Sequence, residues 1–336
     1  MKIAIVPQPG IIKSTAGGYN KRMYHLVEGL ERLGHKVKIF ALPGSKTKGE
    51  LDTSIYFGKK PYRYSLETRQ YFISEAIARS QDCDIINCQT DHLATVFDKF
   101  SKKPIVHTVI TSTLPPTAVS LLKFYKKLNY STVSGAPKKK FDFIKFKSVI
   151  YNGIDTENFS FKEKPRDYFL CLGRVAWDKG VHQAVRAARK TDIKLRIAGK
   201  KVDKPYFDKE IKPYLGKNIR YLGLIQPSKF QKKIKLIQNA KAVFMLSEVD
   251  EGFSNTVLEA LACGTPVIAS SRYSYREIIN SGKNGFIVRN KPQLLAAIKS
   301  IDAIDRFQCR ASVEKRYNYQ QMALGYEKLF KKILKK

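Results

Sequence analysis

The chain has 336 residues, of which 62 are Lys or Arg and 29 are Asp or Glu, giving a formal net charge of +33. At 43% hydrophobic residues it can bury sizeable cores, which excludes a disordered chain, and its length predicts two domains. No apolar run approaches the roughly 18 residues of a membrane-spanning helix. The five cysteines lack CxxC or Cys/His spacing, so we expect reduced thiols in a cytoplasmic protein, without disulfides or zinc.

The excess positive charge is spread over both halves of the chain. Such a field favours polyanionic partners, namely nucleic acid, an anionic lipid surface or nucleotide substrates. A lysine-rich proteome would give the same composition without any partner. Because the sequence has neither RNP aromatics nor zinc-finger spacing, we expect no specific nucleic acid binding.

The first half begins as a strand–loop–helix–strand unit. A strand over 2–7 leads into a loop containing Gly17 and Gly18, a helix that stops at Gly34, and a strand over 37–42. This order predicts a Rossmann-like domain, although neither GxGxxG nor GxxxxGK[ST] is present. The glycine pair fits a tight turn or a loop that approaches a ligand closely.

Two histidines follow at the expected ends of strands in this half. Strands are predicted over 84–88 and 104–109, which places His92 and His107 at the edge where ligands bind in such sheets. Residues 117–129 have an apolar stripe flanked by lysines. That pattern fits a helix packed on the core or a basic amphipathic helix lying on an anionic membrane.

A polar stretch over 156–166 reads as a linker to a second series of strands and helices. Its most informative stretch runs from Glu251 to Ala269, where an acidic residue and Gly-Phe-Ser-Asn precede a helix and an apolar strand. A helix that begins near Ser254 or Asn255 would aim free backbone N–H groups at the carboxyl ends of the strands. Such an arrangement suits an anion, for example a phosphate.

Taken together, these motifs resemble the retaining GT-B glycosyltransferases of glycosyltransferase family 4. The resemblance covers nearly the whole chain and rests on Gly17-Gly18, NGID at 152–155, GRVAWDKG at 173–180, the glutamates eight apart at 251 and 259, ACGTPVIAS at 262–270 and NGFIV at 284–288. Among members of the family, the short length and the layout of 84–175 are most similar to tetrahydrobiopterin glucosyltransferases.

The resemblance implies an α/β fold in which two Rossmann-like domains face each other across a cleft. Residues 1–160 would form the acceptor-side domain and 161–315 the domain that binds the nucleotide sugar. Residues 316–336 would form a terminal helix that packs back towards the first domain. No DxD-type metal motif is evident, so we expect neither a metal nor a cofactor.

The resemblance also implies roles for individual residues. Arg174 and Lys179 would clamp the donor diphosphate, whose charge grows in the transition state. Glu251 would contact the donor sugar and Glu259 the ribose, while His107 would lie near the catalytic centre. The remaining predicted donor contacts are backbone groups or small residues: Gly17, Gly18, Gly252, Phe253, Ser254, Asn255 and Thr256. The sequence departs from the family at Thr108, in 134–140 and in 272–275. The larger side chains of 272–275 are expected to narrow the donor or acceptor pocket.

The expected function is therefore transfer of a hexose from a nucleotide-diphosphate sugar, expected to be a UDP-sugar, with retention and without a metal. The acceptor is open among a small molecule, a glycan and a lipid. One alternative is a transferase that acts on a lipid or lipid-linked glycan from a peripheral position at the inner face of the membrane. A second is a non-catalytic module that binds a sugar nucleotide or glycan.

Overall fold

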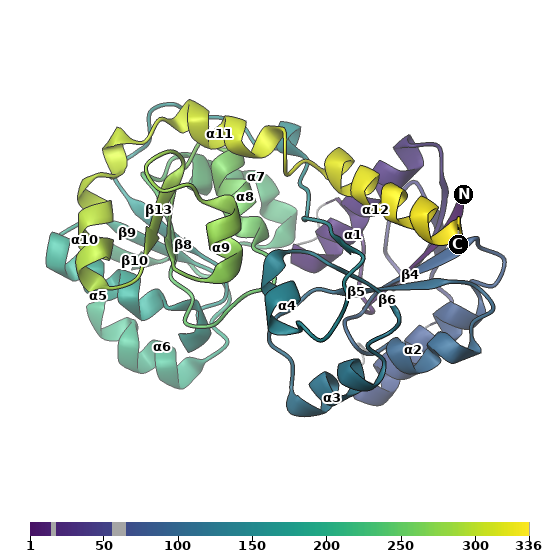
Figure 1. Ribbon diagram of the computed structural model, residues 1–336. Coiled ribbons are helices and arrows are strands. Elements are labelled where there is room, and N and C mark those ends of the chain that lie inside the picture. The colour runs from purple at the N-terminus through teal and green to yellow at the C-terminus, as the bar shows by residue number, and fades with distance from the viewer. Residues whose placement is uncertain (15–17, 56–64, 336) are drawn as a thin grey trace. The chain divides into compact units, whose positions relative to one another are not determined.

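The computed structural model describes residues 1–14, 18–55 and 65–335, which form an α/β protein (Figure 1). The chain divides into two compact units, each with its own parallel sheet. Unit 1 contains Met1–Gly153 and Tyr319–Lys336, and unit 2 contains Ile154–Asn318. Among the described helices, none is both long enough and apolar enough to cross a membrane.

Within the described residues, unit 1 has a seven-stranded sheet of order β3-β2-β1-β4-β5-β6-β7 in which the paired strands are parallel. The order reverses between β1 and β4, which creates the topological switch point of a doubly wound sheet. The strands are β1 (Lys2–Pro7), β2 (Lys36–Phe40), β3 (Glu50–Asp52), β4 (Ile85–Gln89), β5 (Ile105–Val109), β6 (Asn129–Thr132) and β7 (Ser148–Val149).

Helices cover both faces of this sheet. Alternate residues of β1 point to opposite faces, and since they are apolar on both, each face needs a covering layer. Ile3 and Ile5 belong to one buried cluster with apolar residues of α1 and α12, while Ala4 and Val6 belong to another with residues of α2. The helices of unit 1 are α1 (Gly18–Arg32), α2 (Leu66–Ala78), α3 (Pro116–Phe124), α4 (Gly135–Lys140) and α12 (Tyr319–Leu334), with a 3₁₀ segment η1 (Thr95–Phe100).

The last helix of the chain, α12, returns to unit 1 and packs along α1 (Figure 1). The close approach depends on Gly29 of α1, where a Cβ atom would lie 2.7 Å from that of Ala323. Arg22 fixes the pair by donating to the hydroxyl of Tyr326 at 2.9 Å and to the side chain of Gln89 at 2.8 Å. One buried guanidinium therefore joins α1, β4 and α12.

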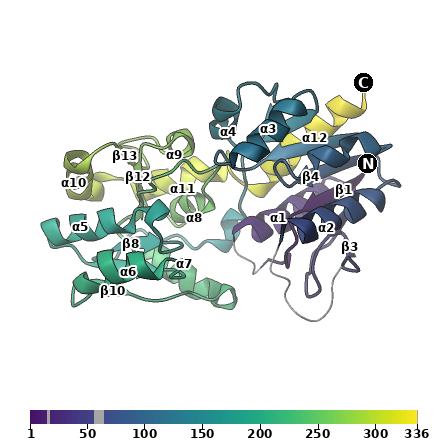
Figure 2. The same cartoon turned by 90° about the horizontal axis from the view of Figure 1, so that it is seen from below.

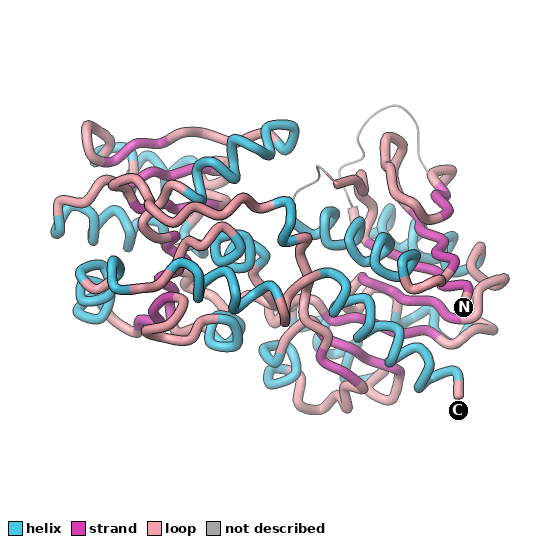
Figure 3. Tube along the Cα trace, turned by 90° about the horizontal axis from the view of Figure 1, so that it is seen from above, coloured by secondary structure: helices cyan, strands magenta, loops and turns pink. Residues whose placement is uncertain are grey.

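Among the described residues, unit 2 has a six-stranded parallel sheet of order β10-β9-β8-β11-β12-β13, whose switch point lies between β8 and β11. Figures 2 and 3 show its strands between layers of helices. The strands are β8 (Phe169–Leu172), β9 (Leu195–Ala198), β10 (Ile219–Tyr221), β11 (Val243–Met245), β12 (Val267–Ser270) and β13 (Gly285–Val288). The helices are α5 (Val181–Thr191), α6 (Lys204–Glu210), α7 (Phe230–Gln238), α8 (Asn255–Ala262), α9 (Tyr273–Ile278), α10 (Lys291–Lys299) and α11 (Arg306–Glu314), with 3₁₀ segments η2 (Thr156–Asn158), η3 (Trp177–Lys179), η4 (Lys212–Tyr214), η5 (Pro227–Lys229) and η6 (Ile301–Ala303).

The polar stretch 156–166 is bound into unit 2 instead of serving as a free linker. Arg310 of α11 donates to the carbonyl of Phe159 at 2.7 Å, and Arg306 donates to that of Lys162 at 2.7 Å. Arginine is suited to such sites because its guanidinium carries several donors in a fixed geometry. These contacts are long-range in sequence, so the polar composition of the stretch did not reveal them.

The predicted helix over 117–129 is shorter in the structure, where α3 ends at Phe124. The residues that follow turn into β6, which begins at Asn129 and pairs with β5. β3, β6 and α4 were not predicted, because each has six residues or fewer and therefore shows little periodicity.

Candidate functional site

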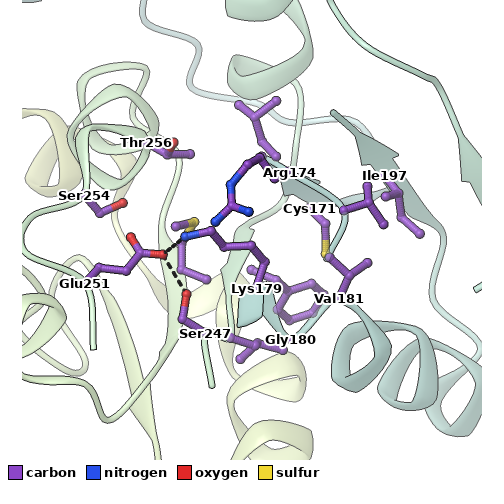
Figure 4. Close-up of a pocket in the computed structure, with 16 residues that line it drawn as sticks. Cys171, Arg174, Lys179, Gly180, Val181, Ile197, Ser247, Glu251, Ser254 and Thr256 are labelled. Atoms are coloured by element: carbon purple, nitrogen blue, oxygen red, sulfur yellow. Dashed lines mark hydrogen bonds and ion pairs between the residues drawn. The ribbon is translucent and has the colours of Figure 1, made fainter. Parts of the chain in front are cut away.

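A pocket lies at the carboxyl ends of the central strands of unit 2, where β8 and β11 meet (Figure 4). This is the switch point of the sheet, where open α/β folds bind their ligands. Its walls come from the end of β8 and the loop after it, from β9, from the end of β11 and from the start of α8. The lining includes Arg174, Lys179, Glu251, Ser254 and Thr256, which are five of the residues singled out in the sequence.

Two glycines allow the backbone segments around this pocket to come close together. Gly180 has φ +63°, and a Cβ atom there would lie 1.8 Å from the carbonyl oxygen of Leu246. At Gly199, with φ +153°, a Cβ atom would lie 1.6 Å from the carbonyl oxygen of Gly173. Both positions need glycine for space as well as for backbone conformation.

The centre of the pocket is an ion pair between Lys179 and Glu251, whose positions are 72 residues apart in the chain. The ammonium group of Lys179 donates to Oε1 of Glu251, and the hydroxyl of Ser247 donates to the same oxygen at 2.8 Å (Figure 4). The side chains of Lys179 and Glu251 are 24% and 15% exposed. A ligand in the pocket can therefore reach both.

A hydrogen-bond chain behind Glu251 fixes the orientation of its carboxylate. Because the single proton of the Ser247 hydroxyl is given to Glu251, Tyr275 must donate to Ser247, at an O···O distance of 2.9 Å. Burial, followed by the nearby charge of Glu251, raises the pKa of Tyr275 well above its usual value. The phenol therefore stays protonated and keeps its role as a donor.

Arg174 adds a second cation at the more open side of the pocket. Its guanidinium donates to Asp178 at 2.7 Å, and its side chain is 54% exposed. Asp178 also lies 3.8 Å from Lys179. An arginine that is half exposed keeps further N–H donors for an anionic ligand, since one acceptor uses only part of its donor set.

The beginning of α8 faces the same pocket. Ser254 occupies the N-cap position, its side chain makes no capping hydrogen bond, and Asn255 is the first helical residue. The hydroxyls of Ser254 and Thr256 line the pocket. The helix terminus therefore offers backbone and hydroxyl donors close to two cations, which suits a phosphate or sugar ligand.

Other predicted donor residues lie in the same segment but outside the pocket lining. Gly252, Phe253 and Asn255 precede or begin α8, and the ring of Phe253 packs 5.9 Å from that of Tyr317. Glu259 is 5% exposed and forms an ion pair with Lys233 of α7 at 2.5 Å. Its predicted contact with a ribose stays a prediction.

His107 lies in the strand that the sequence predicted to carry it. It is the middle residue of β5, is 0% exposed, and its Nε2 lies 2.8 Å from Oδ2 of Asp98. The ring of Tyr130 on the next strand packs against it. The described contacts of His107 all lie within unit 1, and its predicted place near the catalytic centre stays a prediction.

The other predicted residues of unit 1 lie around its switch point. Gly18 is exposed, begins α1 and has φ +52°, whereas Gly17 lies outside the described residues. His92 follows β4 and is partly buried, and burial lowers its pKa. Beside it, Asp91 accepts hydrogen bonds from the N–H groups of Ile110 and Thr111, and burial raises its pKa to about 6.

Among the residues described, no group of His, Cys, Asp and Glu side chains is arranged to hold a metal ion. The five cysteines are buried as free thiols.

Sequence reasoning did not identify Ser247 and Tyr275, although they hold Glu251 in place. We expect Ser247→Ala to lower kcat/KM about tenfold, because an unsupported carboxylate loses a hydrogen bond worth roughly 1–3 kcal/mol. Steady-state kinetics would measure this loss. Tyr275→Phe leaves the bond between Ser247 and Glu251 intact, so it should cost less; an equal or larger loss would contradict the order of donors in the chain.

Comparison with known families gives two matches that together span residues 16–312. Residues 16–158 match the model of Glycosyltransferase Family 4, and residues 154–312 match that of Glycosyl transferases group 1. The uncharacterized glycosyltransferase MJ1607 of Methanocaldococcus jannaschii is 26% identical, with 87% of this chain and 86% of that protein covered. A second relative from the same organism, MJ1178, is 25% identical, and the chain spans only about half of its length, 53%.

A Campylobacter jejuni relative is 27% identical over 84% of this chain and 73% of its own length. It is named N-acetylgalactosamine-N,N'-diacetylbacillosaminyl-diphospho-undecaprenol 4-alpha-N-acetylgalactosaminyltransferase. Solved structures share the fold at lower identity. AviGT4, a glycosyltransferase of avilamycin A biosynthesis, has a TM-score of 0.75 at 20% identity, covering 99% of this chain and 98% of its own. Anabaena Alr3699/HepE, solved with UDP, has a TM-score of 0.76 at 15% identity, covering 99% and 100%.

Two Rossmann-like sheets with these matches define a glycosyltransferase of the GT-B fold. The protein is therefore a glycosyltransferase in which residues 16–158 match a family 4 domain and residues 154–312 match a group 1 domain.

Proposed function

We propose that the protein transfers a hexose from a nucleotide-diphosphate sugar, with UDP as the nucleotide, and that the pocket of unit 2 binds the donor. The observation that carries this proposal is the placement of Lys179, Glu251 and the N-terminus of α8 around one pocket at a switch point. The UDP complexes of the HepE relative support the choice of nucleotide.

Each group of the pocket has a defined task in this proposal. Lys179, Arg174 and the first N–H groups of α8 bind the diphosphate and stabilise the charge that grows as it leaves. Glu251 accepts hydrogen bonds from hydroxyls of the transferred sugar. Ser247 and Tyr275 keep its carboxylate oriented, since Tyr275 donates to Ser247 and Ser247 donates to Glu251.

We propose a retaining reaction that needs no metal. The bond between C1 of the sugar and the diphosphate oxygen breaks, and a bond from C1 to the acceptor oxygen forms on the same face. The acceptor proton passes to the departing phosphate oxygen, so no enzymic nucleophile is required. With two cations and a helix N-terminus beside the phosphates, the protein itself supplies the positive charge that a metal provides elsewhere.

NMR of donor hydrolysis tests the stereochemistry and the metal requirement together. The protein is incubated with α-linked UDP-hexoses in EDTA without added acceptor, and the first free sugar is expected to be the α-anomer. Initial release of the β-anomer would contradict retention. Activity that disappears in EDTA and returns with Mg²⁺ would contradict the metal-independent reaction while leaving the donor pocket intact.

A second candidate function differs in the acceptor: the sugar would be transferred to a lipid-linked glycan. The name of the Campylobacter relative describes such a transfer for that protein. The observation that favours it is on α3, where Leu121 and Phe124 are 36% and 81% exposed. Lys123, Lys126 and Lys127 accompany them and are exposed. Exposed apolar side chains flanked by lysines are typical of helices that lie in an anionic membrane interface. The similarity to tetrahydrobiopterin glucosyltransferases would instead make a reduced pterin the acceptor.

We expect Leu121→Ser/Phe124→Ser to reduce sedimentation with vesicles of phosphatidylcholine and phosphatidylglycerol by at least tenfold, because both side chains lose apolar area that would enter the interface. Leu66→Ser, which changes a 53% exposed leucine of α2, is the matched control. Equal binding by the double variant and the wild type would remove α3 as a membrane contact.

A further inference from the structure

A second groove of unit 2 is lined by basic side chains and shares no residue with the donor pocket. It runs between α7 and the strands β8, β9 and β10. Its lining contains one carboxylate, Asp167, and six cationic side chains, which are Arg166, Lys194, Arg196, Lys229, Lys232 and Lys235. Asp167 is already engaged by Lys194 at 3.0 Å and by Lys241 at 3.8 Å. The groove therefore has a strong excess of positive charge.

The most informative residue of the groove is Arg196 on β9. Its Nη1 atom is buried, and no hydrogen-bond partner for it exists among the described residues. In the parallel register, Arg196 pairs with Arg220 on β10, so two guanidinium groups stand side by side on the same face of the sheet. Burial and the charge of Arg220 both lower the pKa of Arg196. Like charges directly opposite on neighbouring strands destabilise a sheet unless an anion neutralises them.

The floor of the groove is rigid. The ring of Tyr168 lies beneath the guanidinium of Arg196, at 5.8 Å from ring centroid to Cζ. The hydroxyl of Tyr168 donates to the carbonyl of Leu236 on α7 at 2.7 Å, which fixes the helix relative to β8. Arg196 therefore lies over a ring that is itself hydrogen-bonded to α7.

Apolar side chains lie beside the charged part of the groove. Leu222 and Leu224 follow β10 and are 44% and 50% exposed, and Ile225 also lines the groove. A guanidinium fork with surrounding lysines matches the oxygens of a phosphoryl group. The leucines favour an organic phosphate over the bare inorganic ion, since they offer contact to its carbon skeleton.

We propose that this groove is a second anion site of the protein and binds the phosphoryl group of an organic phosphate. The ligand is either a soluble phosphate ester or the headgroup of a phospholipid, because both present the same phosphoryl chemistry to Arg196 and the lysines of α7.

Two experimental arms distinguish the sources, both with the full chain carrying Lys179→Met so that the donor pocket does not contribute. In the soluble arm, glycerol 3-phosphate at ten times its dissociation constant is expected to raise Tm by about 3 °C. In the lipid arm, vesicles with phosphatidylglycerol are expected to bind the protein more tightly than vesicles of phosphatidylcholine alone. A response in either arm that depends on the groove supports the site and names its source.

Two variants test whether the response depends on the groove: Arg196→Gln and the double variant Lys229→Gln/Lys232→Gln. The lysine pair should lower vesicle partitioning about 25-fold if the ligand is a lipid, at roughly fivefold for each lysine near the surface. Arg196→Gln should abolish the shift with glycerol 3-phosphate if the ligand is soluble. The matched control is Lys283→Gln/Lys299→Gln, which removes two exposed lysines of unit 2 away from the groove.

The thermal stability of Arg196→Gln without ligand separates a ligand-binding role of Arg196 from a structural one. Because the arginine pair repels itself, Arg196→Gln without ligand should unfold at the same or a higher temperature than its parent. A clear loss of stability would show that Arg196 supports the fold and would overturn the proposal. No response in either arm, or a response that the groove variants leave unchanged, would overturn it as well.

Discussion

Lys179→Met is expected to reduce sugar transfer by a factor of about 10²–10³, the loss typical for removing one group that stabilises transition-state charge. The methionine keeps most of the side-chain length but removes the cation that pairs with Glu251 and that we propose binds the diphosphate. The loss should appear mainly in kcat, because the charge of the leaving diphosphate grows during bond breaking. Steady-state kinetics with the natural donor would measure it.

The matched control is Lys190→Met, which removes an exposed lysine from the last turn of α5. It should retain full activity and the same thermal stability as the wild type. Glu251→Gln should be impaired comparably to Lys179→Met, since it keeps the shape of the side chain but removes its charge. Full activity in either of these two site variants would contradict the assignment of the pocket.

Gly180→Ala is expected to destabilise unit 2 by about 2–5 kcal/mol, combining overpacking with a left-handed backbone conformation. The added Cβ atom would lie 1.8 Å from the carbonyl oxygen of Leu246, which is backbone and cannot move aside cheaply. Since Gly180 follows Lys179 directly, the relaxation should also displace the lysine from Glu251. Chemical denaturation and donor titration of the same variant would measure both effects.

Gly216→Ala provides the control for this substitution. Gly216 is exposed, and a Cβ atom there would meet nothing within 4 Å. Its stability should stay within about 0.5 kcal/mol of the wild type. A Gly180→Ala protein as stable and active as Gly216→Ala would show that the loop relaxes freely, against the close packing described for the pocket.

The pattern of alternating strands and helices was enough to predict two Rossmann-like sheets. It worked because parallel strands are buried on both faces and therefore appear as continuous apolar runs, such as Phe169–Leu172 and Val243–Met245. The short edge strand β3 and the helix α4 were missed for the opposite reason. They have too few residues to show a hydrophobic periodicity, and contacts with residues far along the chain decide their conformation.

In the candidate site, too, some residues could be predicted from the sequence and others could not. The resemblance to glycosyltransferase family 4 singled out Arg174, Lys179 and Glu251, and the structure brings all three to one pocket at the end of a parallel sheet. The contact between His107 and Asp98 could not be predicted, because it depends on how the 3₁₀ segment η1 packs against β5, and the role of His107 at the catalytic centre stays a prediction. The support given by Ser247 and Tyr275 depends on tertiary contacts of common residue types.

Calorimetric titration with UDP, GDP and ADP in EDTA tests the central claim most directly, because it measures donor-site binding without an acceptor. We predict one binding site per chain, tightest for UDP, with affinity reduced more than tenfold in Lys179→Met and unchanged in Lys190→Met. Absence of binding by all three nucleotides, or equal binding by the wild type and Lys179→Met, would contradict the account.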